Sequence, residues 1–77
     1  MKDQTPTMTS QSIQYIVSCL AMFARQNNLT RKEACNYLSR FKGLSFTISN
    51  YEAEHQLSLQ ECVDDMKAIC RRNGGAI

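Results

Sequence analysis

The chain has 77 residues, is 43% hydrophobic and 21% charged, and carries a formal net charge of +2. This length allows one domain, and the composition is too apolar and too weakly charged for a disordered chain. No apolar run approaches the roughly 18 residues that a membrane span needs. Because the N-terminal residues also lack the apolar segment of a signal peptide, we expect a cytoplasmic protein with no membrane partner.

The chain begins with a polar, threonine-rich stretch over residues 1–9, which we interpret as a loose arm. A helix is predicted from about Ser10 to Asn27, because apolar residues recur there at helical spacing. The face that we expect to meet the core comprises Ile13, Ile16, Val17, Leu20, Phe23 and Ala24. A narrower stripe on the other side comprises Tyr15, Cys19 and Met22. Small polar residues flank this stripe, so we expect it to be partly exposed and to contact a partner.

A second helix is predicted to begin after Thr30, because Thr30 to Glu33 has the pattern of a capping box. Gly43 is expected to end this helix, since glycine adopts the left-handed cap conformation without steric cost. Residues 44–48 then alternate between apolar and polar side chains as a strand does, but a single strand has no sheet to join. We therefore predict an extended connector, with Phe46 or Ile48 filling the core.

Two more helices follow in the predicted order. A short third helix is expected to reach about Gln56, and a capping box at Ser58 opens the last helix, which runs to about Arg72. The last helix is expected to pack on the first through Leu59, Val63, Met66 and Ile69. Residues 73–77 are expected to fray. The predicted fold is all-α, a small bundle of three main helices plus one short helix in a single domain over residues 10–72.

Four cysteines lie within the predicted helices: Cys19, Cys35, Cys62 and Cys70. None forms a Cys-x-x-Cys pair, whereas zinc ligands usually come in close pairs. Disulfide bonds are not expected either, because they are rare in a reducing compartment. We interpret the four residues as free thiols packed in the core, and we predict no metal and no cofactor.

The charges are separated along the sequence. Residues 25–42 hold five basic residues and one acid, whereas residues 52–65 hold five acids and no lysine or arginine. Several charges suit the helix dipole, which favours acids at helix starts and bases at helix ends: Glu61, Arg40, Lys42, Arg71 and Arg72. Arg31 and Lys32 do not, because they lie in a predicted first turn. They belong either to a plain solvated surface or to a basic patch for an acidic protein or a nucleic-acid backbone.

Tyr51 and His55 are four residues apart, so they share one face of the short third helix, and Asp65 is expected to approach them from the last helix. Such a cluster is capable of acid–base chemistry in principle. We favour a structural role, in which His55 bonds a carbonyl or a carboxylate and fixes the turn into the last helix. Contact with a partner is the further alternative.

Five short stretches of the chain are shared with a known type of domain: Ile13 to Phe23, Leu29 to Ala34, Tyr51 to His55, Leu57-Ser58 and Val63 to Asp65. Through them, about residues 10–70 resemble a family of small bacterial helical domains of unknown function. Its members are often encoded beside an ADP-ribosyltransferase-like protein, which implies an accessory or antitoxin-like binding role. The resemblance marks Tyr51, His55 and Asp65 as a motif with no known role. The four cysteines depart from the family pattern.

No phosphate-binding loop, nucleophile elbow or paired-histidine motif is present, so we do not predict an enzyme. The favoured function is an intracellular protein-interaction module that binds a protein partner or a second copy of itself. The alternative is a DNA-binding helix-turn-helix variant, formed by Leu29 to Leu38 and Ser49 to Gln56. Against it, Glu52 and Glu54 lie where a recognition helix carries basic or amide side chains. Nucleic acid is therefore not the expected partner, although the sequence leaves it open.

Overall fold

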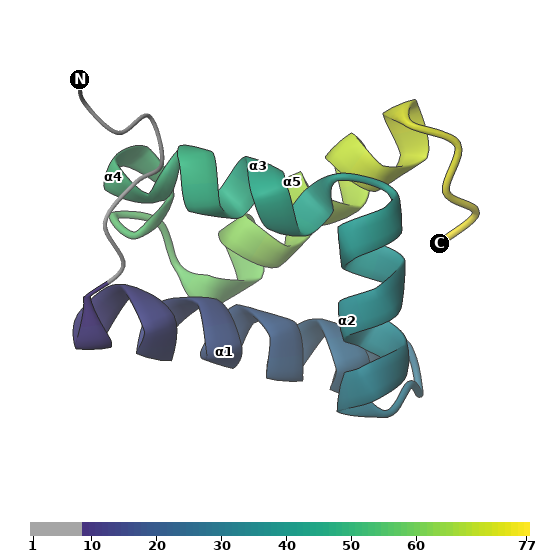
Figure 1. The fold of residues 1–77 in the computed structure, drawn as a ribbon, viewed down its shortest axis with the longest axis horizontal. Coiled ribbons are helices and arrows are strands. Elements are labelled where there is room, and N and C mark those ends of the chain that lie inside the picture. The colour runs from purple at the N-terminus through teal and green to yellow at the C-terminus, as the bar shows by residue number, and fades with distance from the viewer. Residues whose placement is uncertain (1–8) are drawn as a thin grey trace, which may run out of the picture.

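Five helices make up the computed structural model, which describes residues 9–77 (Figure 1). They are α1 (Ser10–Gln26), α2 (Arg31–Arg40), α3 (Gly43–Ser49), α4 (Tyr51–Glu54) and α5 (Leu59–Arg72). No strand occurs in this described part, so the predicted all-α bundle is confirmed. The arm predicted over residues 1–9 lies outside the described residues except for Thr9. Within residues 9–77, no helix has both the length and the apolar character needed to cross a membrane.

Three of the helices begin at capping boxes, each made by two side chains that bond each other's backbone amides. The pairs are Thr9 with Ser12 for α1, Thr30 with Glu33 for α2, and Ser58 with Glu61 for α5. Each pair satisfies two amides that would otherwise have no partner at a helix start. The second and third boxes are the predicted ones. The first is harder to see in the sequence, because Ser12 takes the place of the usual glutamate or glutamine.

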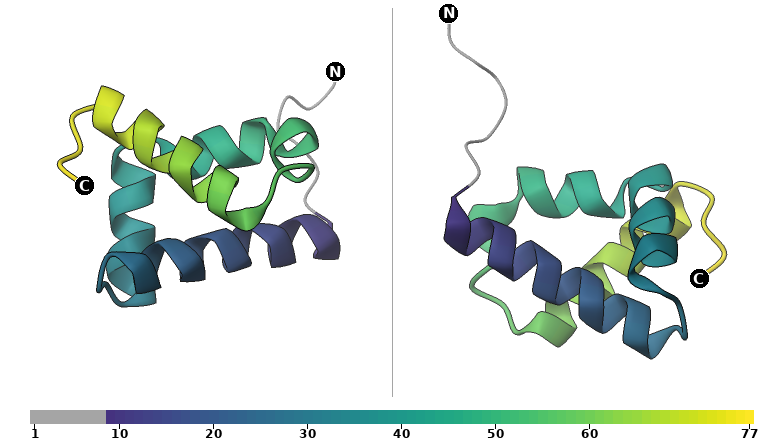
Figure 2. Two further views of the ribbon diagram at one scale, coloured as in Figure 1. Left: turned by 180° about the vertical axis from the view of Figure 1, so that it is seen from behind. Right: turned by 60° about the horizontal axis from the view of Figure 1, so that its bottom comes forward.

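Helix α1 runs along one side of the molecule, and the other helices lie on one side of it (Figure 1). Both α2 and α5 pack against α1, and α3 packs against α2 and α5. Figure 1 places α2 at the end of the molecule where α1 finishes, and α4 at the opposite end, where α1 begins. The two views of Figure 2 show the same order from other sides.

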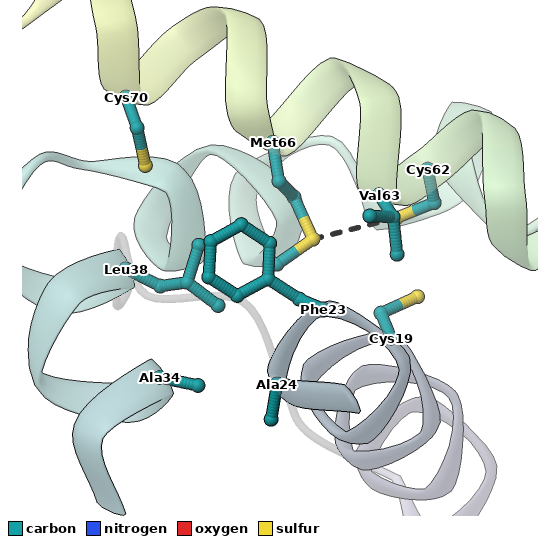
Figure 3. Close-up of a cluster of buried hydrophobic side chains, with 9 residues drawn as sticks. All are labelled: Cys19, Phe23, Ala24, Ala34, Leu38, Cys62, Val63, Met66 and Cys70. Carbon is teal, nitrogen blue, oxygen red and sulfur yellow. Dashed lines mark hydrogen bonds between the residues drawn. The ribbon is translucent and has the colours of Figure 1, made fainter. Parts of the chain in front are cut away.

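The hydrophobic core is formed by nine buried side chains from α1, α2 and α5. They are Cys19, Phe23, Ala24, Ala34, Leu38, Cys62, Val63, Met66 and Cys70 (Figure 3). Of the four predicted contacts of α5, Val63 and Met66 are fully buried, and Leu59 packs at the edge of this core. Ile69 instead lines an open groove with Phe46 of α3.

The predicted connector over residues 44–48 is wrong, because this segment belongs to α3. The chain turns at Lys42, which adopts the left-handed conformation with φ 72°. Gly43, the expected left-handed cap, is instead buried inside the first turn of α3. A Cβ atom added there would lie 2.7 Å from the Sγ atom of Cys70. Glycine is therefore required at this position by the close approach of α3 to α5.

The inward side chain of α3 is also not the predicted one. Phe46 and Ile48 are half-buried, whereas Thr47 is fully buried. The Thr47 hydroxyl donates a hydrogen bond to the Gly43 carbonyl at 3.0 Å, which satisfies it inside the core.

The chain end predicted to fray is folded back onto the bundle. The amide of Ile77 donates to the Tyr37 hydroxyl at 3.0 Å, and Nε of Arg71 donates to the Ile77 carbonyl at 2.9 Å. Ile77 also packs against the core. These contacts hold the residues after α5 against α2 and α5.

Candidate interaction surface

The side of α1 that faces the core differs from the prediction. Its buried residues are Ser12, Ile16, Cys19, Phe23 and Ala24. Ile16, Phe23 and Ala24 belong to the predicted core face, Cys19 belongs to the predicted stripe, and Ser12 lies between the two, so the buried side is turned from the predicted core face toward the stripe. Ser12 tolerates burial because its hydroxyl donates to the Thr9 carbonyl at 2.9 Å and accepts from the Thr9 amide.

The stripe of Tyr15, Cys19 and Met22 is consequently not a free surface. Cys19 is 0% exposed, so the prediction of an accessible stripe is wrong for this residue. Tyr15 and Met22 are half-buried and pack against the core. A partner that used this stripe would have to compete with the packing of the domain itself.

A different strip of α1 is exposed, which we call the α1 ridge: Ile13, Val17, Leu20 and Ala21. Ile13 is 47% exposed and Val17 is 43% exposed, and they are the exposed large hydrophobic residues of the described chain. Leu20 and Ala21 are half-buried. The sequence of α1 contains no acid, and Arg25 is its single base. The ridge is therefore both apolar and uncharged.

Three predicted site residues form an aromatic row: Tyr15 of α1, Tyr51 of α4 and His55, which directly follows α4. The Tyr15 and Tyr51 rings meet edge to face, with centroids 5.8 Å apart and an interplanar angle of 75°. The Tyr51 and His55 rings are stacked with centroids 4.6 Å apart. His55 is exposed, and its Nδ1 atom lies 2.8 Å from the Tyr51 carbonyl oxygen. The predicted carbonyl contact of His55 is therefore present.

Glu54 is a buried residue of this region that the sequence did not single out. The Tyr15 hydroxyl donates to the Glu54 backbone carbonyl at 2.5 Å, which ties α1 to α4. The Glu54 side chain is 6% exposed, and its Oε1 atom has no hydrogen-bond partner. Burial raises the pKa of this carboxyl, and the neighbouring carboxyl of Asp65 raises it further. Asp65 therefore approaches α4 as predicted, but its neighbour there is Glu54.

Thiols lie next to this polar region, at the contact of α1 with α5. Cys19 and Cys62 are fully buried, and Sγ of Cys62 lies 3.9 Å from Sδ of Met66 (Figure 3). Hydrogen bonding to Cys62 and burial raise the pKa of Cys19, which disfavours its thiolate form. All four cysteines are free, with Cys35 half-buried. Among residues 9–77, no three potential ligands from His, Cys, Asp and Glu gather where they could hold a metal.

The predicted basic residues lie apart from the aromatic row. Arg31 and Lys32 are exposed in the first turn of α2, at the opposite end of the molecule from α4 (Figure 1). The eight predicted partner-binding residues therefore do not form one site. They divide into the aromatic row with Asp65, the remaining stripe residues Cys19 and Met22 of α1, and the basic start of α2.

A family model described as "Protein of unknown function (DUF3791)" matches residues 11–73. The chain belongs to the DUF3791 family. No curated protein and no solved structure matches it. The DUF3791 match includes the α1 ridge, the aromatic row and the basic start of α2, so each of these surfaces lies within the family domain.

Proposed function

We propose that this DUF3791 member is a protein-interaction module that binds its partner through the α1 ridge. The exposure of Ile13 and Val17 carries the proposal. Isolated exposed apolar side chains are common on protein surfaces. Here, however, Ile13 and Val17 are consecutive along one side of the helix and continue into Leu20 and Ala21. This spacing places all four on one stripe, as on a helix that packs against another helix.

The chemistry of the ridge suits the centre of an interface. Interface cores are depleted in charged residues, and α1 has a single charge, on Arg25. Burying a fully exposed valine or isoleucine contributes about 1.5–3 kcal/mol. Ile13 and Val17 are each about half exposed, so a partner would gain about 1 kcal/mol from each of them.

The proposed role is binding without a catalytic step, as an accessory or antitoxin-like partner of another protein in the bacterial cytoplasm. Four free thiols suit a reducing compartment, where disulfides do not persist. The aromatic row ends at the exposed His55, so it offers a second contact for the same partner beside the start of α1.

DNA binding by a helix-turn-helix variant is the weaker candidate. The two segments assigned to it are separated by α3, and the expected recognition helix is the four-residue α4 with Glu54 buried. Helix α3 itself carries no charged or amide side chain. We expect duplex DNA to bind weakly and without sequence preference. A specific affinity in the nanomolar range at physiological salt would favour the DNA-binding function instead.

The proposal is tested by purifying the tagged chain from its native host and identifying the bound protein by mass spectrometry. Val17→Glu places a charge on the α1 ridge and is expected to lose that protein. Asn36→Glu, at an exposed position of α2, adds the same charge elsewhere and is expected to retain it. If Val17→Glu is folded by circular dichroism and still retains the partner, the α1 ridge is not the binding surface.

A further inference from the structure

Two of the four free thiols meet where α1 packs against α5. Cys19 of α1 and Cys62 of α5 are both fully buried, and a hydrogen bond joins their side chains. In Figure 3 the sulfur atom of Cys19 points from α1 toward α5, on the side where Cys62 lies. The two residues are far apart in the sequence, so the fold itself brings their thiols together.

The other two cysteines lie in different surroundings. Cys70 is fully buried, with its Sγ atom against Gly43 of α3. Burial raises the pKa of Cys70, which disfavours its thiolate form. Cys35 is half-buried on α2. Both residues are therefore internal controls for any chemistry that depends on the contact between Cys19 and Cys62.

The hydrogen bonds around Cys62 favour its thiolate form. The bond with Cys19 is the largest cause that lowers the pKa of Cys62, and the Tyr15 hydroxyl acts in the same direction. Burial opposes these bonds without reversing their effect. The pKa of Cys19 is raised instead, so this thiol keeps its proton and donates it to the bond. Disulfide exchange begins with a thiolate, and here a second thiol lies beside it.

We propose that Cys19 and Cys62 are a site of reversible oxidation, at which a hydroperoxide converts the two thiols into a disulfide between α1 and α5. This inference goes beyond the proposed function and does not depend on it, because no partner takes part. The core of the domain would then carry a redox-sensitive cross-link in addition to its apolar packing.

The oxidation takes two steps, with hydrogen peroxide as the simplest hydroperoxide. The Cys62 thiolate attacks one oxygen and breaks the O–O bond, which leaves a sulfenic acid on Cys62 and a hydroxide that recovers the Cys62 proton as water. The Cys19 sulfur then attacks the sulfenic sulfur, and the hydroxyl group leaves with the Cys19 proton as a second water. Two thiols have lost two electrons and two protons, and one peroxide has become two waters. Two glutathione thiols reverse the change and leave as glutathione disulfide.

Burial makes this site slow to react but selective. Hydrogen peroxide is little larger than water, and it reaches the sulfurs when the helices open locally. The sulfenic acid on Cys62 then has the Cys19 thiol as its neighbour, which favours the disulfide over further oxidation. The disulfide closes α2, α3 and α4 into a loop between its two sulfurs. Because such a loop restricts the unfolded chain, the oxidised domain should resist urea better than the reduced one.

Peptide mapping tests the pairing with the full chain, because trypsin places each cysteine in a different peptide. These are residues 3–25 for Cys19, 33–40 for Cys35, 43–67 for Cys62 and 68–71 for Cys70. The folded chain is treated with hydrogen peroxide, and its remaining thiols are blocked with N-ethylmaleimide in urea. We expect a chain lighter by two hydrogen atoms before blocking, a linked peptide of residues 3–25 and 43–67, and blocked thiols at Cys35 and Cys70. Glutathione added after the peroxide should remove the link.

The unfolded chain and three variants are the controls. Oxidation in concentrated urea should give a mixture of pairings that includes Cys35 and Cys70. Cys19→Ala and Cys62→Ala should each abolish the linked peptide, whereas Cys35→Ser should keep it. The wild-type result decides the matter even if an alanine variant fails to fold. A folded chain that forms no link between Cys19 and Cys62, or that gives the same mixture as the unfolded chain, would overturn the inference.

The urea midpoint of the oxidised chain is a second readout. Peroxide should raise the midpoint of the wild type and leave that of Cys19→Ala without a gain, a comparison that also controls for oxidation of the methionines. Glutathione should return the wild type to its reduced midpoint. If the linked peptide formed but lowered the midpoint, the disulfide would have to distort the domain, and the two thiols would not be placed for it in the native fold.

Discussion

The core differs in chemistry between its α2 end and its α4 end. At the α2 end, Phe23, Leu38 and Met66 are fully buried, and the Phe23 ring stacks on Tyr37 with centroids 5.7 Å apart. At the α4 end, the buried groups include Thr47 and the Glu54 carboxyl. The first end is held by apolar packing, whereas the second depends on hydrogen bonds and contains a carboxyl whose pKa is raised by burial.

The apolar end of the core mainly supplies stability, whereas the polar end mainly fixes geometry. Apolar burial is the larger source of stability, and it is insensitive to pH over the physiological range. Buried polar groups add little net stability, because each must replace the hydrogen bonds it made with water. They do fix geometry, and here the bond from Tyr15 to Glu54 sets the position of α4 and of the aromatic row.

The largest effect is expected at the apolar end, from Met66→Ala. Met66 is fully buried among α1, α2 and α5, so its truncation should lower the free energy of unfolding by about 2–5 kcal/mol. Urea denaturation followed by circular dichroism measures this loss. Ile69→Ala, on the same helix but half-buried, should cost clearly less. Equal stability of Met66→Ala and the wild type would mean that α5 packs through another face.

At the polar end, Tyr15→Phe is expected to have a smaller effect. It removes the hydrogen bond to the Glu54 carbonyl and leaves the ring stacking in place, so it should cost about 0.5–1.5 kcal/mol. Tyr51→Phe is the matched control, because its ring is in the same row and the Tyr51 hydroxyl makes no hydrogen bond within residues 9–77. The same urea measurement on both variants compares them. If Tyr15→Phe and Tyr51→Phe lowered the free energy of unfolding by similar amounts, the hydrogen bond from Tyr15 to Glu54 would not be what positions α4.

The sequence predicted the parts of the fold that follow from local rules. The capping boxes at Thr30 and Ser58 set the starts of α2 and α5, because their chemistry involves residues only three apart. Helix α3 escaped prediction since seven residues are too short to be stable alone. Its formation depends on burying Gly43 and Thr47 in contact with other helices, which no local pattern indicates.

The candidate site was predicted less well, for a related reason. The helical spacing of apolar residues predicted that Ile13 and Val17 lie in the core. It could not indicate that Ser12 is buried, because the Ser12 hydroxyl is satisfied by a hydrogen bond within the helix cap. The burial of Glu54 was equally hidden, because an acid within an acidic stretch normally indicates solvent. The contact between Tyr51 and His55 was predicted, since the two residues lie within a single helical turn.

A substitution at Lys42 tests the α2 end of the core, and it is expected to make the chain more stable. Its φ of 72° is unfavourable for any residue with a Cβ atom, and glycine relieves this cost. Lys42→Gly is therefore expected to raise the free energy of unfolding by about 0.5–1 kcal/mol. Thermal unfolding measures the gain. Ser39→Gly, within α2, should instead cost about 0.5 kcal/mol. A loss at Lys42→Gly as well would mean that the turn does not hold Lys42 in the left-handed conformation.

The smallest effect, and the one most specific to the polar end, is expected from Glu54→Gln. A protonated carboxyl and a carboxamide are both neutral and similar in shape, so the variant should match the wild type in acid. The pKa of Glu54 lies above its ordinary value of 4.5 in the folded chain. The unfolded chain loses this proton near pH 4.5, whereas the folded chain loses it only at the higher folded-state pKa. At a pH between these two values, the folded chain therefore carries a proton on Glu54 that the unfolded chain does not. The contribution of Glu54 to the free energy of unfolding should therefore be fully present below pH 4.5 and be lost as the pH rises through the folded-state pKa.

Urea titrations from acid to neutral pH measure this slope in each variant. Glu54→Gln should remove the decline, so its advantage over the wild type should grow with pH. Asp65→Asn should reduce the decline only in part, because burial, the larger cause of the raised pKa, is unchanged. Glu52→Gln alters an exposed acid on the same helix and should keep the wild-type slope. If Glu54→Gln kept that slope as well, the pH dependence would have to come from another group, and the α4 end would not depend on a protonated carboxyl.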